Sequence, residues 1–106
     1  MSHPSISIDK LISAISHRTR WRILNEILKE DVSFPASELA RRFGLSLTSM
    51  CKHIKVLCEA GVLQASYGNH YLVPAHWRVP GERTLDLGAV VLRLDRLDGE
   101  EEAQKR

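Results

Sequence analysis

Two stretches of helical periodicity meet at a glycine within residues 37–63, and this segment constrains the fold more than any other part of the chain. The first stretch carries one apolar face, made of Leu39, Ala40 and Phe43. Gly44 is expected to end this helix, because glycine takes the left-handed turn conformation without a steric penalty. Ser46 is expected to cap the next helix. The second stretch carries a longer apolar stripe, formed by Leu47, Met50, Ile54 and Leu57. The pattern predicts two short helices that pack together across a tight turn.

The opposite face of the second helix is polar and cationic. It presents Thr48, Ser49, Lys52, His53 and Lys55. Hydroxyl, imidazole and amine groups bond to base edges and phosphates, and a single helix fits the major groove of DNA. The alternative is a merely solvated face, because any amphipathic helix in a small protein has one. The order of helix, tight turn, helix and then Gly61 before a hairpin favours a helix-turn-helix that binds DNA.

The chain has 106 residues, of which 43% are apolar, and this size predicts one small domain with a modest core. No apolar run approaches the roughly 18 to 20 residues needed to cross a bilayer, and the N-terminus lacks the layout of a signal peptide. We therefore expect a soluble cytoplasmic protein without membrane contact. Cys51 and Cys58 fall on one expected helix with about 10.5 Å between their Cα atoms, beyond the roughly 7 Å limit of a disulfide.

The net charge of +2 is small, but it is unevenly distributed along the chain. Residues 1–80 hold ten Lys and Arg against six Asp and Glu, a net +4, whereas residues 81–106 hold five against seven, a net −2. The first eighty residues are therefore the expected anion-binding part of the chain.

Two further helices are expected before the helix-turn-helix. The first carries a stripe of Ile8, Leu11, Ile12 and Ile15. The second carries a stripe of Trp21, Ile23, Leu24, Ile27 and Leu28, and Trp21 is expected in the core. Ser16 and His17 interrupt the periodicity between the two helices. The β-prone piece 32–34 is an expected edge strand, and Pro35 prevents a continuous helix into the next element.

A β-hairpin is expected directly after the second helix of the pair. Segments 62–67 and 70–73 flank the turn pair Gly68-Asn69, and a hairpin in this place is the wing of a winged helix-turn-helix. The tip residues are Tyr67, Asn69 and His70. They would lie near the sugar-phosphate backbone or the minor groove. The tip has no Lys or Arg, so simple solvent exposure of its side chains is an equal alternative.

Residues 85–97 fit two patterns equally well. A helical stripe competes with the strand-like alternation of Leu85, Leu87 and Ala89. Either element exposes more apolar surface than a small domain covers alone, so we expect it to pack against a second subunit. The expected fold class is α+β, mainly α, with a two-stranded β wing and this C-terminal apolar element. The expected organisation is a disordered segment 1–7, a DNA-binding domain 8–80, a dimerisation element 81–99 and a disordered tail 100–106.

Two stretches of the chain resemble the ArsR-type winged helix-turn-helix repressors. Residues 16–24, SHRTRWRIL, are similar to the S-D-P-T-R-L-R-I-L opening of that family's second helix. The segments SELA, GLS and HIKVLCEAGVL, which begin at residues 37, 44 and 53, are similar to its turn and recognition helix. The resemblance covers residues 8–73 and is specific for the winged helix-turn-helix fold. It is less specific within that fold, because related repressor families share the second half of the pattern.

The resemblance implies a bacterial transcriptional regulator, a repressor, that binds a palindromic operator in double-stranded DNA as a homodimer. The residues that match the family's reading positions are Ser46, Thr48, Ser49, Lys52 and His53. Base-edge contacts are expected from Thr48, Ser49 and His53. Phosphate contacts are expected from Arg42, Lys52 and Lys55. Arg20 is expected to bond within the protein, to a carboxylate or a backbone carbonyl.

The chain departs from the metal-sensing members of the family. Residues 37–43 lack the Cys-x-Cys motif that many members carry there, and residues 85–106 lack His. Cys51 and His53 lie about 200° apart around a helix and cannot share one ion. No metal and no cofactor is therefore expected, and no effector is indicated. Cys51 is either a space-filling residue or a thiol whose oxidation releases DNA.

The leading hypothesis is a DNA-binding repressor without catalytic activity. The alternative is a winged-helix protein-interaction module, in which the apolar C-terminal segment docks a partner and the polar helix face is solvated. An enzyme is least favoured, because the sequence has no nucleophile elbow, no phosphate-binding glycine loop and no cluster with metal-ligand spacing.

Overall fold

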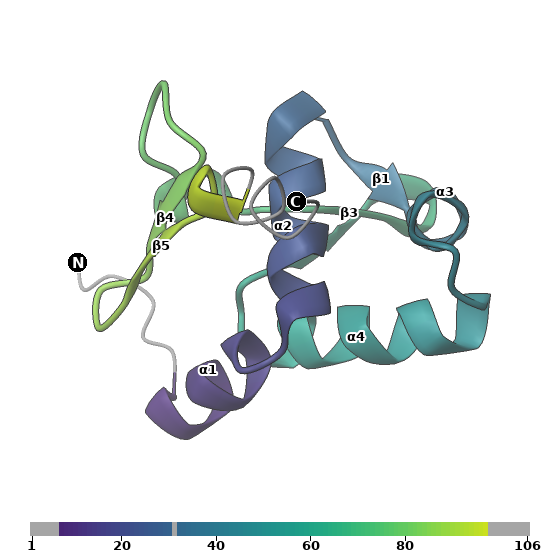
Figure 1. Ribbon diagram of the computed structural model, residues 1–106, viewed down its shortest axis with the longest axis horizontal. Coiled ribbons are helices and arrows are strands. Elements are labelled where there is room, and N and C mark those ends of the chain that lie inside the picture. Colours follow the sequence, from purple (N-terminus) through teal and green to yellow (C-terminus); the bar gives the residue numbers. More distant parts are fainter. Residues whose placement is uncertain (1–6, 31, 98–106) are drawn as a thin grey trace, which may run out of the picture.

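The computed structural model describes residues 7–30 and 32–97 (Figure 1). Its first elements are helices α1 (Ile8–Ile15) and α2 (Arg18–Glu30), strand β1 (Phe34–Pro35), and helices α3 (Ala36–Phe43) and α4 (Leu47–Glu59). Strands β2 (Gln64–Ser66), β3 (His70–Leu72), β4 (Thr84–Asp86) and β5 (Val91–Arg93) follow. The expected disordered segments 1–7 and 100–106 lie outside the described residues, apart from Ser7.

The helix-turn-helix forms where the sequence predicts it. Gly44 ends α3 in the left-handed conformation, with φ at 65°, and backbone N–H groups of the turn close onto the last carbonyls of that helix. Ser46 caps α4, because its hydroxyl accepts a hydrogen bond from the Ser49 N–H at 3.1 Å. These two local devices fix where α3 ends and where α4 begins.

The four helices bury their apolar faces in one core. Among its most buried members are Leu11, Ile23, Leu24, Leu39, Met50, Ile54 and Leu57. Trp21 is half-buried against this core, and its indole N–H donates to the Ile15 carbonyl at 2.6 Å. Leu47 departs from the prediction: it is 53% exposed, because the first residue of α4 extends past the end of the core. The buried stripe of α4 therefore begins at Met50.

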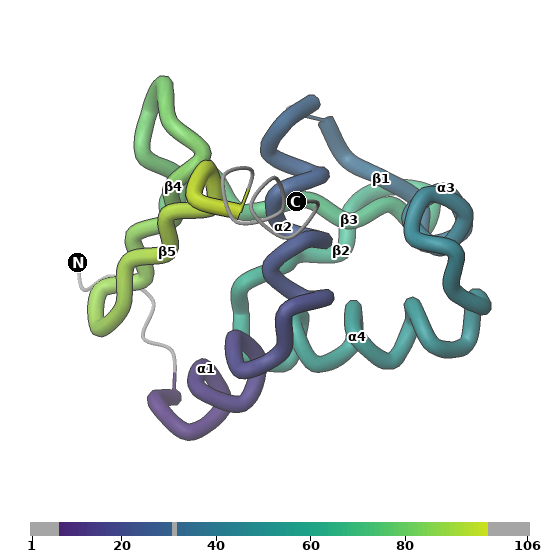
Figure 2. The backbone as a smooth tube through the Cα atoms, viewed as in Figure 1, coloured from purple at the N-terminus to yellow at the C-terminus, as the bar shows by residue number. Residues whose placement is uncertain are grey.

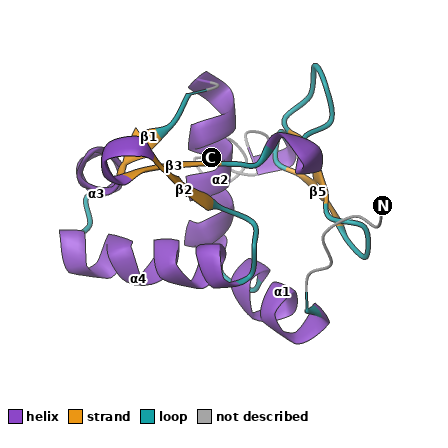
Figure 3. Ribbon diagram, turned by 180° about the vertical axis from the view of Figure 1, so that it is seen from behind, coloured by secondary structure: helices purple, strands orange, loops and turns teal. Residues whose placement is uncertain are grey.

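Helix α2 contacts both α1 and α4, and α1 also touches α4, so these three helices meet at one corner of the molecule (Figures 1 and 3). Helix α4 runs along one side, near the N-terminal end of α2. None of the helices in the described ranges, 7–30 and 32–97, is long and apolar enough to cross a bilayer.

The wing is a three-stranded antiparallel sheet in the order β1-β3-β2. Ser66 pairs with His70 across the expected hairpin, and Gly68 and Asn69 both take positive φ, at 66° and 61°. Two such residues in succession match the right-handed twist of short hairpins. The edge strand is confirmed, although it covers Phe34–Pro35 and not 32–34. Figure 2 shows the chain leaving α4, running through β2 toward α3 and returning through β3 beside β1.

The C-terminal region is a second antiparallel hairpin, formed by β4 and β5. The alternative of one helix over 85–97 is therefore wrong, because the chain reverses after Leu87 through Gly88, whose φ is 86°. The expected exposed apolar surface is also absent from its leucines: Leu85, Leu92 and Leu94 are at most 1% exposed. Alternation along two strands turns these leucines toward their own domain, so covering them requires no second subunit.

Candidate nucleic-acid interface

Helix α4 has an exposed surface outside its buried stripe. One open, shallow surface there is lined by Leu47, Thr48, Cys51, Lys52 and Lys55. All five side chains are exposed. The Ser46 cap fixes the N-terminal end of α4, and the buried stripe packs the helix onto the core. Together they hold this surface in place. We call these five residues the outward face of α4.

The charge of this face is positive. Glu59, the last residue of α4, is its one acidic residue, and Lys55 Nζ lies 3.9 Å from Glu59 Oε1. The Lys55 side chain is 77% exposed, so water weakens this pair. Lys52 has no ion pair with any residue in the described ranges. Of the two lysines, Lys52 therefore presents the less compensated charge.

Ser46 and Ser49 form a small hydroxyl cluster at the N-terminus of α4. The Ser46 hydroxyl donates to Ser49 Oγ at 3.0 Å while it accepts the Ser49 N–H. Ser46 is therefore occupied by capping. Its bonds leave the hydroxyl hydrogen of Ser49 to donate outward.

His53 lies beside the outward face of α4 and not on it, and the base-edge contact expected of it stays a prediction. Its ring is half-buried toward the start of α2, where Arg20 Nε donates to His53 Nδ1 at 3.3 Å. The His17 ring stands edge-on to it, with 4.8 Å between ring centroids. Arg20 Nη1 also donates to the Ser13 carbonyl at 2.8 Å, so the carbonyl bond expected of Arg20 is confirmed.

Arg42 is paired with carboxylates of its own chain. Its guanidinium bonds to Glu26 at 3.0 Å, to Glu38 at 2.9 Å and to Glu30, and it lies 4.6 Å from the centroid of the Phe34 ring. The bonds to Glu30 and Glu38 raise the pKa of Arg42. Three carboxylates already compensate this cation, so Arg42 is a weaker candidate for a phosphate contact than the lysines of α4.

The tip of the wing carries an exposed aromatic ring. Tyr67 is 96% exposed, and Asn69 beside it is also exposed. His70 is half-buried, and its Nδ1 lies within hydrogen-bond distance, 3.2 Å, of Ser33 Oγ. The tip therefore offers a planar ring and an amide, whereas the His70 ring is held against the segment before β1.

The two cysteines differ in environment. Both are free thiols, as their separation on α4 requires. Cys51 is exposed on the outward face of α4, so the space-filling interpretation of this residue is wrong. Cys58 is half-buried, and burial raises the pKa of its thiol.

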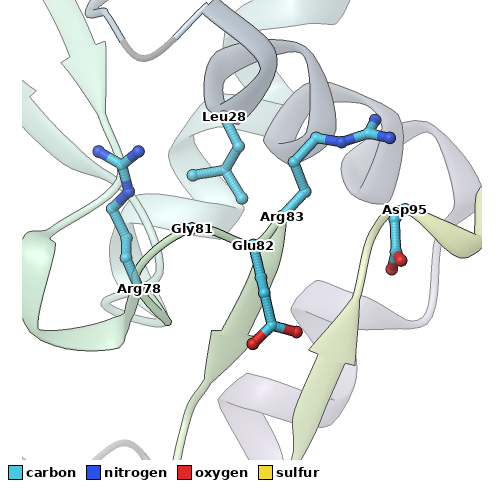
Figure 4. A pocket seen from close by; sticks show the side chains of 6 residues that line it. All are labelled: Leu28, Arg78, Gly81, Glu82, Arg83 and Asp95. Atoms are coloured by element: carbon cyan, nitrogen blue, oxygen red, sulfur yellow. The ribbon is translucent and has the colours of Figure 1, made fainter.

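A separate cavity of about 450 Å³ lies near the other end of α2 (Figure 4). Leu28 lies between the guanidinium groups of Arg78 and Arg83, while the Glu82 carboxylate points away from them. Arg83 is tied to the helix by a 2.9 Å bond to Asn25 Oδ1. The cavity is lined by α2 on one side and by residues of the C-terminal region on the other. Within residues 7–30 and 32–97, no group of three or more His, Cys, Asp or Glu side chains is placed to hold a metal ion.

Residues 15–64 match the family model of a helix-turn-helix domain. The match spans α2, β1, α3, α4 and the first residue of β2, and so contains the turn at Gly44 and the whole of α4. With the wing sheet attached, the domain is a winged helix-turn-helix, a class characteristic of DNA-binding regulators. No curated protein and no solved structure matches the chain.

Sequence reasoning missed two features of this site. The exposure of Leu47 has no signal in the apolar periodicity, because the stripe continues to the first turn of α4. The contact of His17 and Arg20 with His53 joins residues 33 or more positions apart. Only the packing of α2 on α4 brings them together.

Proposed function

We propose that the protein is a sequence-specific, double-stranded DNA-binding transcriptional regulator, a repressor, that inserts α4 into the major groove. The observation that carries this proposal is the outward face of α4, an exposed, cationic helix surface held by a helix-turn-helix. A helix of this kind places its first residues on base edges while flanking cations meet phosphates. The protein acts in the cytoplasm, where the DNA of a bacterium lies.

Four side chains of the outward face of α4, together with the neighbouring Ser49, have a role in this proposal. The Thr48 and Ser49 hydroxyls bond to base edges, because they lie near the N-terminus of α4. Leu47 adds an apolar contact of the kind that a thymine methyl group accepts. Lys52 and Lys55 neutralise phosphates on either side of the groove.

The wing adds a contact of different chemistry. The exposed Tyr67 ring packs on deoxyribose, and the Asn69 amide bonds to a backbone oxygen. Because the tip lacks cations, its contribution is insensitive to salt, unlike that of the lysines of α4. Replacement of Tyr67 by Ala should weaken binding equally at low and high salt.

The homodimer remains part of the proposal, with a different surface. The leucines of the C-terminal hairpin are covered within the chain, whereas Ile8 and Ile12 lie four residues apart on α1 and are 51% and 54% exposed. A second copy that covers this face gives two recognition helices for a palindromic operator. Sedimentation equilibrium of the Ile12→Lys variant should show weaker self-association. Val32→Lys, at a residue with 54% exposure away from α1, is the matched control.

The test of the proposal is selection of bound duplexes from a random DNA pool, followed by fluorescence anisotropy on the selected sequence. We expect an inverted repeat with half-sites separated by about 10 base pairs, one helical turn. Repression is then measured with this operator placed over a reporter promoter. Recovery of no preferred sequence, with no salt-dependent binding, rules out the proposal.

The exposed thiol of Cys51 offers a way to block this interface. A bulky maleimide on Cys51 would stand between α4 and the groove, whereas Cys58 is half-buried. Alkylation should therefore abolish DNA binding by the wild type and leave the Cys51→Ser variant active. The competing interpretation, a protein-interaction module that docks a partner through the C-terminal segment, loses its basis, because the leucines of that segment are buried.

A further inference from the structure

A cluster of His17, Arg20 and His53 joins the recognition helix to the rest of the domain. His17 precedes α2, Arg20 lies in the first turn of α2, and His53 lies in the middle of α4. Arg20 also reaches the Ser13 carbonyl in α1, at 2.8 Å. One guanidinium therefore ties together the three helices that meet at this corner (Figure 1).

The hydrogen bonds of the cluster define the charge state of the His53 imidazole. A guanidinium can only donate, so His53 Nδ1, at 3.3 Å from Arg20 Nε, must accept and carry no proton. The backbone N–H of Thr19 donates to His17 Nδ1 at 3.2 Å, so that nitrogen also carries no proton. This second bond satisfies an N–H group at the start of α2, as an N-cap does. The His53 ring is therefore neutral in this arrangement.

A proton on His53 Nδ1 breaks its bond to Arg20 and adds a positive charge beside the guanidinium. The His17 and His53 centroids are 4.8 Å apart, so a charge on either ring acts on the other at short range. Burial, His17 and Arg20 together lower the pKa of His53 below its ordinary value of 6.5. The three helices carry other charged groups near the cluster. Arg18 starts α2, and a neighbouring hollow is lined by Asp9 and Lys10 of α1 and Glu59 of α4.

We propose that His17, Arg20 and His53 are positioning residues that hold the recognition helix in its DNA-binding orientation only while the His53 imidazole is neutral. The predicted effect on DNA binding rests on the proposed function. The role of the cluster in orienting α4 does not. Acidification from pH 7.5 to 5.5 loosens α4 and weakens DNA binding. The direction is diagnostic, because histidine protonation otherwise adds positive charge and strengthens attraction to phosphates.

The first measurement needs no DNA. In an NMR titration of the free protein, the His53 ring should titrate below 6.5, and backbone amides of α4 should shift with the same midpoint. The His17→Asn/His53→Asn double variant should show no such shift of the α4 amides. Asparagine keeps an acceptor oxygen near the position of Nδ1 and does not titrate, and it is a favourable N-cap. A His53 midpoint at or above 6.5, or α4 amides that ignore it, overturns the inference.

The second measurement is fluorescence anisotropy with a labelled 25-base-pair duplex of mixed sequence, at constant ionic strength. A difference of one pKa unit between free and bound protein corresponds to about a tenfold change in affinity. We expect wild-type affinity to fall about threefold to tenfold between pH 7.5 and 5.5. The double variant should keep or gain affinity. His76→Asn, which changes an exposed histidine outside the cluster, should behave as the wild type.

The two measurements test the proposed function and the positioning role of the cluster separately. If no duplex binds at pH 7.5, the proposed function fails. The NMR titration still shows whether the cluster controls the orientation of α4. If wild type and double variant both gain affinity on acidification, the positioning role of the cluster is refuted although DNA binding stands.

Discussion

Replacement of Lys52 by Ala tests the outward face of α4 through its charge. Lys52 is exposed and has no ion pair within the described residues. Its whole positive charge is therefore available to displace a counterion from a DNA phosphate. Removing one phosphate contact should reduce the slope of log K against log salt by about 0.9. Over a fourfold change in salt, from 50 to 200 mM, that slope corresponds to about a 3.5-fold difference. The variant should therefore lose about 3.5 times more affinity at 50 mM than at 200 mM.

The assay is a fluorescence anisotropy titration with the selected duplex at four or more salt concentrations. Lys55→Ala should reduce the slope less, because Glu59 already compensates part of the Lys55 charge at 3.9 Å. Lys29→Ala, which removes a lysine at the far end of α2, is the control and should leave the slope unchanged. An unchanged slope for Lys52→Ala, or an equal reduction for Lys29→Ala, would show that binding depends on overall charge and not on α4.

Three predictions concern the domain itself. Gly44→Ala should destabilise it by about 1 to 2 kcal/mol in urea denaturation, because a Cβ meets no atom within 4 Å there and only the left-handed backbone is strained; Gly44→Asn should cost less. Leu92→Ala should lower the free energy of unfolding by about 2 to 5 kcal/mol. Val91→Ala, at the half-exposed neighbour, should lower it by less than about 0.5 kcal/mol. Equal losses in the two variants would refute the packing of the C-terminal hairpin. Bonds from Arg41 and Arg42 lower the pKa of Glu38 from 4.5 to about 2, so its contribution to stability is complete above pH 4.5 and is lost as the pH falls toward 2. The Glu38→Gln variant should lack this acid-dependent loss, as measured by denaturation at pH 5 and pH 3.

Local patterns predicted the fold well where one element carries its own signals. The period of the apolar residues placed α1 and α2, and Gly44 with Ser46 placed the turn between α3 and α4. Residues 85–97 could not be decided this way. Their leucines suit a helix by spacing and a strand by alternation, and the choice is made by Gly88 and by the packing of both strands onto one core.

The functional surface was less predictable, because charge alone does not say what a side chain contacts. Arg42 is as basic as Lys52 in the sequence, yet Glu26 and Glu30 of α2 lie close enough to bind it. Those carboxylates are 16 and 12 residues away, so only the packing of α3 beside α2 reveals them. The lysines of α4 have a carboxylate neighbour only at the end of their helix, and the prediction of exposed cations holds for them.

His53 shows why the polar residues of a recognition helix do not share one role. At about 100° per residue, Lys52 lies about 165° from the centre of the buried stripe of α4, whereas His53 lies only about 65° from it. A side chain at that smaller angle sits at the border between core and solvent, where another helix can reach it. Arg20 and His17 do so, and they hold the ring in a neutral state. The helix thus divides into a face that packs, a face that is free to contact DNA, and a border that sets its orientation. A substitution at the border should change affinity for all DNA sequences alike, whereas one at Thr48 should change which sequence is preferred.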